Sequence, residues 1–417
     1  MQEINRVEFT EEMKKTHTIL IPNMLSSHFQ IVEKLMEVEG YKAELLRTDN
    51  ENIVREGVKN VHNDTCYPAL LVVGQMIDAL KSGKYDLDHV ALMITQTGGG
   101  CRASNYIHLL RKALKNNGME HIPVISVNFS GLEKNSGFKF TYSLIVKLVY
   151  ALIYGDLMMW ISNQCKPYEL HKGDTEKVSE KWIKIIVDSL NSPKFLRVKH
   201  NYQQILKDYD AIVRTKEKKI RVGIVGEIYM KYAPLGNNNL EEFLIKEGAE
   251  PVLSGVMDFI AYCCENMVMD YELYKINRVN RNVARVVIHY LVHAQKKMIK
   301  AIKNHGVFRP MANFNEVKDI ATGYISKGVK MGEGWLLTSE MLELIHSGTE
   351  NIVCTQPFGC LPNHIVARGM MKKIKDNYPQ SNIVAIDYDP GASRINQQNR
   401  IKLMLSNAKM NAKEVVN

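Results

Sequence analysis

The stretch that decides the fold is His89-Val90-Ala91-Leu92-Met93-Ile94-Thr95, which is followed by Gly98-Gly99-Gly100-Cys101 and a helical segment over 105–115. The run, with five apolar residues from Val90 to Ile94, predicts a buried strand, and the glycines predict a sharp turn between strand and helix. Strand–turn–helix units of this kind are typical of a parallel sheet covered by helices.

The same unit recurs on both sides of this stretch. Upstream and downstream, the sequence predicts strands over 18–22, 43–46 and 122–127 and helices over 26–38 and 69–80. A second series starts with a strand over 220–226 and continues with a helix over 240–246 and a strand over 251–253. It closes with strands over 351–353 and 382–386, a helix over 364–375 between them, and a last helix after a loop over 387–393. The order of the second series suggests a duplication of the first.

Between the two series the pattern is helical, with long helices expected over 142–159 and 175–190. The segment 144–153 is apolar almost all round, which predicts a buried helix; Lys147 and the short length argue against a membrane span. We therefore expect an α/β protein with two tandem parallel-sheet domains of the Rossmann or flavodoxin-like kind. Their boundaries are 1–137 and 219–417, with a helical region over 138–218.

Composition limits the functional classes. The chain has 417 residues, 45% hydrophobic and 24% charged, which is typical of a soluble protein of two or three domains. The net charge of +9 comes without a dense Lys/Arg run, so we expect no nucleic-acid partner. No signal-peptide pattern starts the sequence, and we expect a cytoplasmic protein without a membrane partner.

Cysteines mark three loops that lie far apart in the sequence. Seven cysteines without a secretion signal predict reduced thiols rather than a disulfide framework. Cys66, Cys101 and Cys360 lie beside glycine or proline, where the backbone turns, and thiolates presented in this way favour an iron–sulfur site. Cys354 is a less certain ligand, because a small apolar side chain at the end of a strand explains it equally well. Zinc is the main alternative metal, but the chain has no CxxC pair.

The other cysteines have simpler interpretations. Cys263 and Cys264 lie in an apolar helical stretch and are expected in the core. Cys165 follows a helix, and whether it is a ligand stays open.

Ligand sites of open α/β sheets lie outside the carboxyl ends of the strands. Cys101, Cys354 and the 387–393 loop follow predicted strands, so we expect one composite site between the two domains. His364 is a weak candidate for a proton donor or an orienting residue. Further polar candidates at these loops, each with local capping or strand termination as the alternative, are Asp64, Arg102, Asn105, Asp387 and Asp389. Gly223-x-x-Gly226 lacks the third glycine of a dinucleotide fingerprint and no Walker motif occurs, so we expect no nucleotide site.

Four segments, HNDTCYPALLVVGQ (62–75), TQTGGGCRASNYIHLLRKAL (95–114), QPFGCLPNHIVARGM (356–370) and DYDPGASRINQQNRIKLML (387–405), carry a family resemblance. The chain resembles the 2-hydroxyacyl-CoA dehydratase superfamily over 17–405, and within it the branch found in large acyl-CoA dehydratase activase-related proteins.

The resemblance implies tandem α/β domains that bind a [4Fe–4S] cluster through Cys66, Cys101 and Cys360. It also implies an ATP-hydrolysing iron–sulfur activase that injects one low-potential electron. In characterised dehydratases, which are lyases of anaerobic metabolism, this electron lets a 2-hydroxyacyl-CoA lose water through a ketyl radical. We expect the activase to be a separate protein and this chain to form a homodimer or heterodimer.

Two alternatives remain open at this point. Related proteins carry double-cubane clusters and reduce small molecules, so a reductase or electron-transfer protein without a CoA substrate is the first. A non-catalytic, cluster-bearing partner of the activase is the second.

Overall fold

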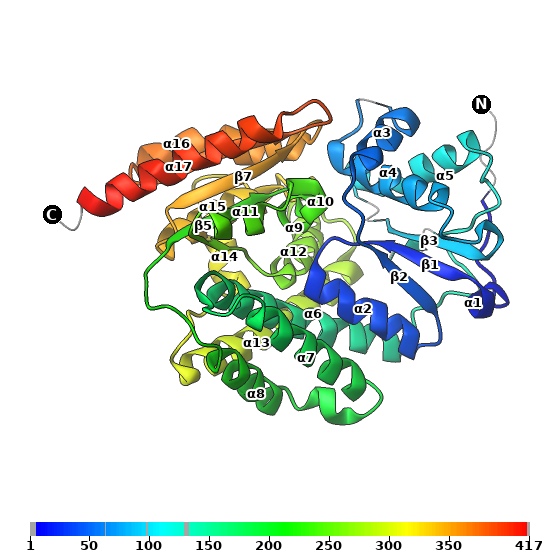
Figure 1. The fold of residues 1–417 in the computed structure, drawn as a ribbon, viewed down its shortest axis with the longest axis horizontal. Helices are drawn as coiled ribbons and strands as arrows, with labels where there is room; N and C mark the ends of the chain where they lie inside the picture. The colour runs from blue at the N-terminus through cyan, green and yellow to red at the C-terminus, as the bar shows by residue number, and fades with distance from the viewer. Residues whose placement is uncertain (1–5, 63, 97–98, 129–132, 415–417) are drawn as a thin grey trace.

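A computed structural model describes residues 6–62, 64–96, 99–128 and 133–414 of the chain. Eight parallel strands form two four-stranded sheets, which confirms the predicted α/β class (Figure 1). The first sheet has the order β2–β1–β3–β4 and consists of β1 (Thr18–Pro22), β2 (Lys42–Leu46), β3 (Val90–Thr95) and β4 (Val124–Val127). The second has the order β6–β5–β7–β8 and consists of β5 (Ile220–Gly226), β6 (Ala249–Val252), β7 (Asn351–Pro357) and β8 (Asn382–Tyr388).

The two sheets share one strand order. In each, the first strand in sequence pairs with the second and the third, and the third pairs with the fourth. The duplication suggested by the sequence is thus matched by topology. Both sheets are parallel, so their functional edges are the carboxyl ends of the strands.

The helices of the first domain include two that the sequence pattern does not predict. They are α1 (Met13–Thr16), α2 (Ser26–Val38), α3 (Glu51–Asn60), α4 (Tyr67–Lys81) and α5 (Tyr106–Asn116). The unpredicted helices are α1 and α3. The first turn of α3 is capped by the Asn50 side chain, which accepts the Asn52 and Ile53 amides at 2.9 and 3.3 Å. Gly57 of α3 and Gly74 of α4 let the two backbones touch, because a side chain at either would collide with the carbonyl group of the other helix.

Further long helices are α6 (Tyr142–Cys165), α7 (Asp174–Ser189), α8 (Val198–Asp210), α12 (Val256–Tyr274) and α13 (Arg278–His305), of which α6, α7, α8 and α13 lie below the sheets in Figure 1. Within the described part of the chain, α6 with its 3₁₀ extension to Tyr168 is the one helix long and apolar enough to cross a membrane, and 56% of its most apolar window is buried. Lys147 pairs with Glu39 of α2 at 2.6 Å, and Asp156 is buried against His28 at 2.8 Å. These contacts make α6 a core helix. Its first two turns are only partly covered, less than the sequence predicts.

The second domain adds α9 (Ile228–Tyr232), α10 (Pro234–Asn237), α11 (Leu240–Lys246), α14 (Phe314–Ile320), α15 (Trp335–His346), α16 (Met371–Asn377) and α17 (Arg394–Glu414). Two predictions are corrected here. The single helix expected over 364–375 is instead a π-helical turn (Asn363–Ala367), a 3₁₀ turn (Arg368–Met370) and α16. Strand β7 runs to Pro357, so Cys354 lies inside the strand rather than at its end.

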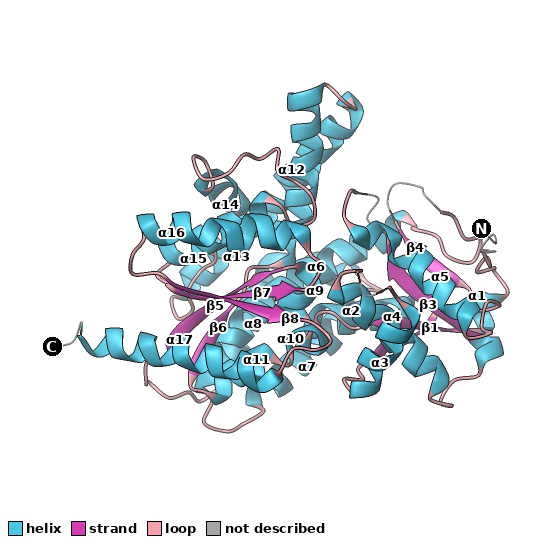
Figure 2. Ribbon diagram, turned by 90° about the horizontal axis from the view of Figure 1, so that it is seen from above, coloured by secondary structure: helices cyan, strands magenta, loops and turns pink. Residues whose placement is uncertain are grey.

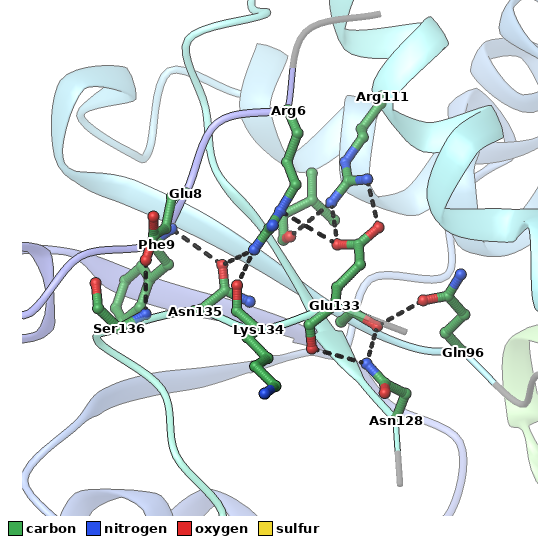
Figure 3. Close-up of polar contacts among 12 residues, drawn as sticks. Arg6, Glu8, Phe9, Gln96, Arg111, Asn128, Glu133, Lys134, Asn135 and Ser136 are labelled. Atoms are coloured by element: carbon green, nitrogen blue, oxygen red, sulfur yellow. Dashed lines mark hydrogen bonds and ion pairs between the residues drawn. The ribbon is translucent and has the colours of Figure 1, made fainter. Parts of the chain in front are cut away.

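The segment before β1 is fixed to the far edge of the first sheet (Figure 3). Glu133 pairs with Arg111 of α5 at 2.6 Å and with Arg6 at 3.5 Å. Asn135 accepts the Phe9 amide at 3.1 Å, and Gly137 donates to the Phe9 carbonyl at 2.9 Å.

Candidate metal centre

The structure brings the loops of Cys66 and Cys360 into direct contact. The Tyr67 amide donates to the Phe358 carbonyl at 2.9 Å. Gly359 has a φ of +75°, and a side chain there would place its Cβ 3.0 Å from the Cys66 Cα. A glycine is therefore required for this approach of two segments almost 300 positions apart in the chain.

The Cys101 loop joins the same place from the end of β3. Residues 97 and 98 of this loop lie outside the described residues, but Gly100 and Cys101 are placed. Gly100 packs on Met331, whose sulfur any side chain at position 100 would strike. Tyr106, in the first turn of α5, has its hydroxyl 2.9 Å from the Cys66 Sγ, which connects the two cysteine loops of the first domain.

All three cysteines begin a helical turn. The Cys66 carbonyl accepts the Ala69 amide at 3.0 Å, that of Cys101 accepts Ser104 at 3.2 Å, and that of Cys360 accepts His364 at 3.2 Å. The positive end of each turn thus lies beside a sulfur atom, where it favours the thiolate. The turn after Cys360 is the π-helical one, and such turns occur frequently at functional sites.

Burial dominates the protonation of these thiols. It raises the pKa of Cys101 to about 11, and it also raises the pKa values of Cys66 and Cys360. The negative charge of Glu227 raises the pKa of all three thiols further, and that of Glu333 raises the pKa values of Cys101 and Cys360. The positive charge of Arg102 lowers the pKa of Cys66. The thiols therefore stay protonated at neutral pH unless a metal displaces their protons.

Two acidic side chains complete the centre, and sequence analysis missed both. Glu227 follows β5 and caps α9 by accepting the Met230 amide at 2.9 Å. Glu333 is 6% exposed; one carboxyl oxygen accepts the Ile228 amide at 3.1 Å, while its Oε2 is buried without a hydrogen-bond partner among the described residues. Burial, together with the charge of Glu333, raises the pKa of Glu227 to about 8. Glu227 was detectable as a polar residue at a strand end, but Glu333 lies in the α14–α15 connection and carries no such signal.

The remaining cysteines lie elsewhere. Cys354 is fully buried in the core between β7 and α15, with its Sγ 3.6 Å from the Asn363 side-chain oxygen. Cys165 is buried beside Tyr209 and Arg214. Cys263 and Cys264 are partly buried on α12 against the helical core.

The polar candidates are distributed around the edge of the centre. His364 is half-buried and contacts the Gln356 side chain, and Arg102 reaches the Asp64 carbonyl. Asp387 pairs with Arg368 at 3.4 Å and Arg400 at 3.6 Å, and Asp389 accepts the Gly391 amide at 2.7 Å. For Asn105 the structure gives an exposed position just before α5.

Three thiols and one unpartnered carboxyl oxygen are the groups at this place that could hold a cofactor. Among the described residues, no three His, Cys, Asp or Glu side chains form a group that could hold one metal ion. Thiolates would suit zinc or an iron–sulfur cluster, and the buried Oε2 of Glu333 is a further polar atom without a hydrogen-bond partner among the described residues.

The sequence matches no protein-family model and no curated protein.

Proposed function

We propose that this chain is an iron–sulfur protein that carries a [4Fe–4S] cluster on Cys66, Cys101 and Cys360 and is reduced by a separate ATP-dependent activase. Its reaction is the elimination of water from a 2-hydroxyacyl-CoA, as the family resemblance implies. The observation that supports the proposal is the contact between the loops of Cys66 and Cys360, together with the contact of Cys66 with Tyr106, five residues after Cys101. We assign the protein to the cytoplasm.

The chain's own residues suit such a reaction. A bound cluster supplies a low-potential electron and a Lewis-acidic iron. The Tyr106 hydroxyl lies 2.9 Å from the Cys66 sulfur and would donate to it when that sulfur is a cluster-bound thiolate, and such donors tune a cluster's potential. Burial raises the pKa of Glu333, so its unpartnered Oε2 could hold a proton and give it to the departing hydroxyl group, which leaves as water.

The electron balance needs no net oxidant or reductant. A C–O bond and a neighbouring C–H bond break, a C=C bond forms, and the electron that starts the reaction is returned at its end. The activase is therefore required to start turnover, in amounts far below the product formed.

The test is anaerobic purification with iron and acid-labile sulfide measured per chain, followed by an activase-dependent assay with 2-hydroxyacyl-CoA esters. About four iron and four sulfide per chain support the cluster, and about eight favour the double-cubane reductase. Negligible iron after anaerobic reconstitution overturns the proposal. A loaded protein that binds the activase tightly but turns over no acyl-CoA is the non-catalytic partner instead.

A further inference from the structure

A cavity of about 500 Å³ lies between helices α12 and α13. Helix α12 extends from the body of the molecule in Figure 2, and α13 packs along it. Asn315 and Lys318 of α14 also line the cavity. Its volume is within the range of pockets that bind small molecules, about 300–1,000 Å³. None of its lining residues belongs to the candidate metal centre, so the cavity is a separate place on the molecule.

One wall of the cavity is apolar, and we call it the apolar floor. It consists of Val268 of α12 and of Ile288 and Val292 of α13, three side chains that line the cavity and are each less than one-tenth exposed. Ile288 and Val292 lie four residues apart and therefore on one face of α13. An apolar ligand body on this floor is favourable, because it removes apolar surface from water.

A polar stripe borders the apolar floor on α13. His289, His293 and Lys296 line the cavity and follow one another at intervals of four and three residues, so they lie on one side of the helix. All three side chains are exposed and make no hydrogen bond or ion pair with the part of the chain that the structure describes. An imidazole presents at least one N–H donor in either tautomer, and a lysine ammonium group presents three. We call these three residues the donor stripe.

Both carboxylates that line the cavity are already paired within the chain. Lys318 lies 3.5 Å from Glu265, and Arg285 lies 3.0 Å from Glu272. These two pairs leave the charge of Lys296 without a counter-charge in the cavity wall. The cavity therefore favours an anionic ligand, since a cationic ligand would have to break an existing ion pair.

We propose that this cavity binds a small organic anion, with the apolar body of the ligand on the apolar floor and its carboxylate, sulfonate or phosphate group at the donor stripe. Hydrogen bonds between a charged donor and an anion are about twice as strong as those between neutral groups, so the stripe gives the site its preference for a charged ligand. This inference concerns a second site and does not depend on the chemistry proposed for the metal centre.

The first test is a fluorescence titration of the full-length protein with 8-anilinonaphthalene-1-sulfonate, an aromatic body that carries one anionic group. We expect saturable binding of one dye per chain. The double variant His293→Ala/Lys296→Ala should weaken binding about tenfold or more, because it removes two members of the donor stripe. Lys297→Ala is the matched control: Lys297 is the neighbouring exposed cation of α13 but does not line the cavity, so the control should bind as the wild type does.

A neutral dye separates the contribution of charge from that of the apolar floor. N-phenyl-1-naphthylamine has the same rings without the sulfonate group. We expect it to bind the wild type more weakly than the anionic dye does, and to bind the double variant and the wild type equally.

A second pair of variants tests the place of binding. Met269 of α12 lines the cavity, whereas Met267, two residues earlier, is 46% exposed and does not line it. Met269→Trp should fill the cavity and abolish binding of both dyes, and Met267→Trp should leave binding unchanged.

Four results would overturn the proposal. They are the absence of saturable dye binding, equal affinity of the wild type and the double variant for the anionic dye, equal affinity of the wild type for the two dyes, and an equal effect of the two tryptophan variants. Displacement of the dye by Zn²⁺ in the wild type but not in His289→Ala would assign the imidazoles to a metal and would also exclude the anion site.

Discussion

Two opposing effects act on the pKa values of the three cysteine thiols, each of which lies at the start of a helical turn. Burial raises the pKa of each thiol, while a backbone amide of the following turn lowers it: Ala69 for Cys66, Ala103 for Cys101 and Asn363 for Cys360. Burial wins in each case. A thiol of this kind is inert toward solvent but reacts with a metal that brings its own positive charge.

The first prediction follows from this balance. Replacing Cys66, Cys101 or Cys360 by alanine should remove most of the iron, because each supplies one of three ligands. Cys264→Ala, in a thiol packed on α12, should keep the wild-type iron content. The measurement is iron and sulfide per chain after identical anaerobic reconstitution. Full iron retention in any one of the three variants would exclude that cysteine from the centre.

Asp258 gives a prediction on the pH dependence of stability. Burial raises its pKa to about 8, and its carboxyl accepts the Gln295 amide at 2.7 Å. In the unfolded chain the pKa is about 3.9, so between about pH 4 and pH 8 the folded state holds a proton that the unfolded state has lost. The contribution of Asp258 to the free energy of unfolding is therefore fully present below about pH 4 and decreases as the pH rises toward 8.

Asp258→Asn should flatten the decline by up to about 1.4 kcal/mol per pH unit, the value for one proton. Denaturant unfolding followed by circular dichroism at several pH values measures the slope, with Asp188→Asn, at an exposed position of α7, as control. An unchanged slope in the Asp258 variant would show that its proton is not linked to folding.

At the scale of elements, the turn between β7 and the π-helical segment depends on Gly359. Its left-handed backbone costs a residue with a side chain about 1–2 kcal/mol, and its contact with Cys66 leaves no room for a Cβ. Gly83 has a similar φ of +73° but no neighbouring atom within 4 Å of the Cβ position. A comparison of substitutions at Gly359 and Gly83 therefore distinguishes the cost of backbone strain from that of a steric clash.

Gly359→Ala should lose both stability and iron, whereas Gly83→Ala should lose only the stability that the backbone strain costs. Thermal melting and iron content, measured on the two variants side by side, test this difference. Equal iron content in the two would mean that the contact between the Cys66 and Cys360 loops is not needed for the centre.

Helices and strands were predicted correctly where the periodicity of apolar residues is strong. Predictions failed where packing between elements decides the local structure. Helix α2 and strand β1 begin and end where the sequence pattern places them, because each has an uninterrupted buried face. Helix α3 was missed although Ile53, Val54 and Val58 follow a helical spacing, and the closeness of its packing depends on Gly57 against α4, which the spacing does not reveal. The break after Cys360 was also not predictable, because the side chain of Asn363 turns into the core to bond the Thr355 carbonyl at 3.0 Å.

At the scale of the whole molecule, the place of the candidate centre could be predicted from the ends of the strands, but not all of the residues around it. Parallel strands bring their carboxyl ends to one edge, which explains why Cys101 and Cys360 were detectable. The end of β7 was placed too early, so Cys354 lies inside the strand rather than after it, and its role as a ligand stays a prediction. Glu333 reaches the centre through the fold of a connection more than 100 residues from β5, and no local pattern reports this.

The position of the centre leads to a last prediction about both domains together. Two proposed ligands come from the first domain and one from the second, so a bound cluster ties the domains to each other. A ligand that binds only the folded state adds its binding free energy to stability. Anaerobic reconstitution should therefore raise the melting temperature of the wild type, and removal of iron by a chelator should reverse the rise.

Cys360→Ala should abolish this rise, because it breaks the link to the second domain, while Cys264→Ala should retain it. Differential scanning calorimetry of the apo and reconstituted forms measures the shift, and limited proteolysis of the same samples reports whether the domains separate. A wild type that binds four irons without any change in melting temperature would place its cluster within one domain, away from the junction at Cys66 and Gly359.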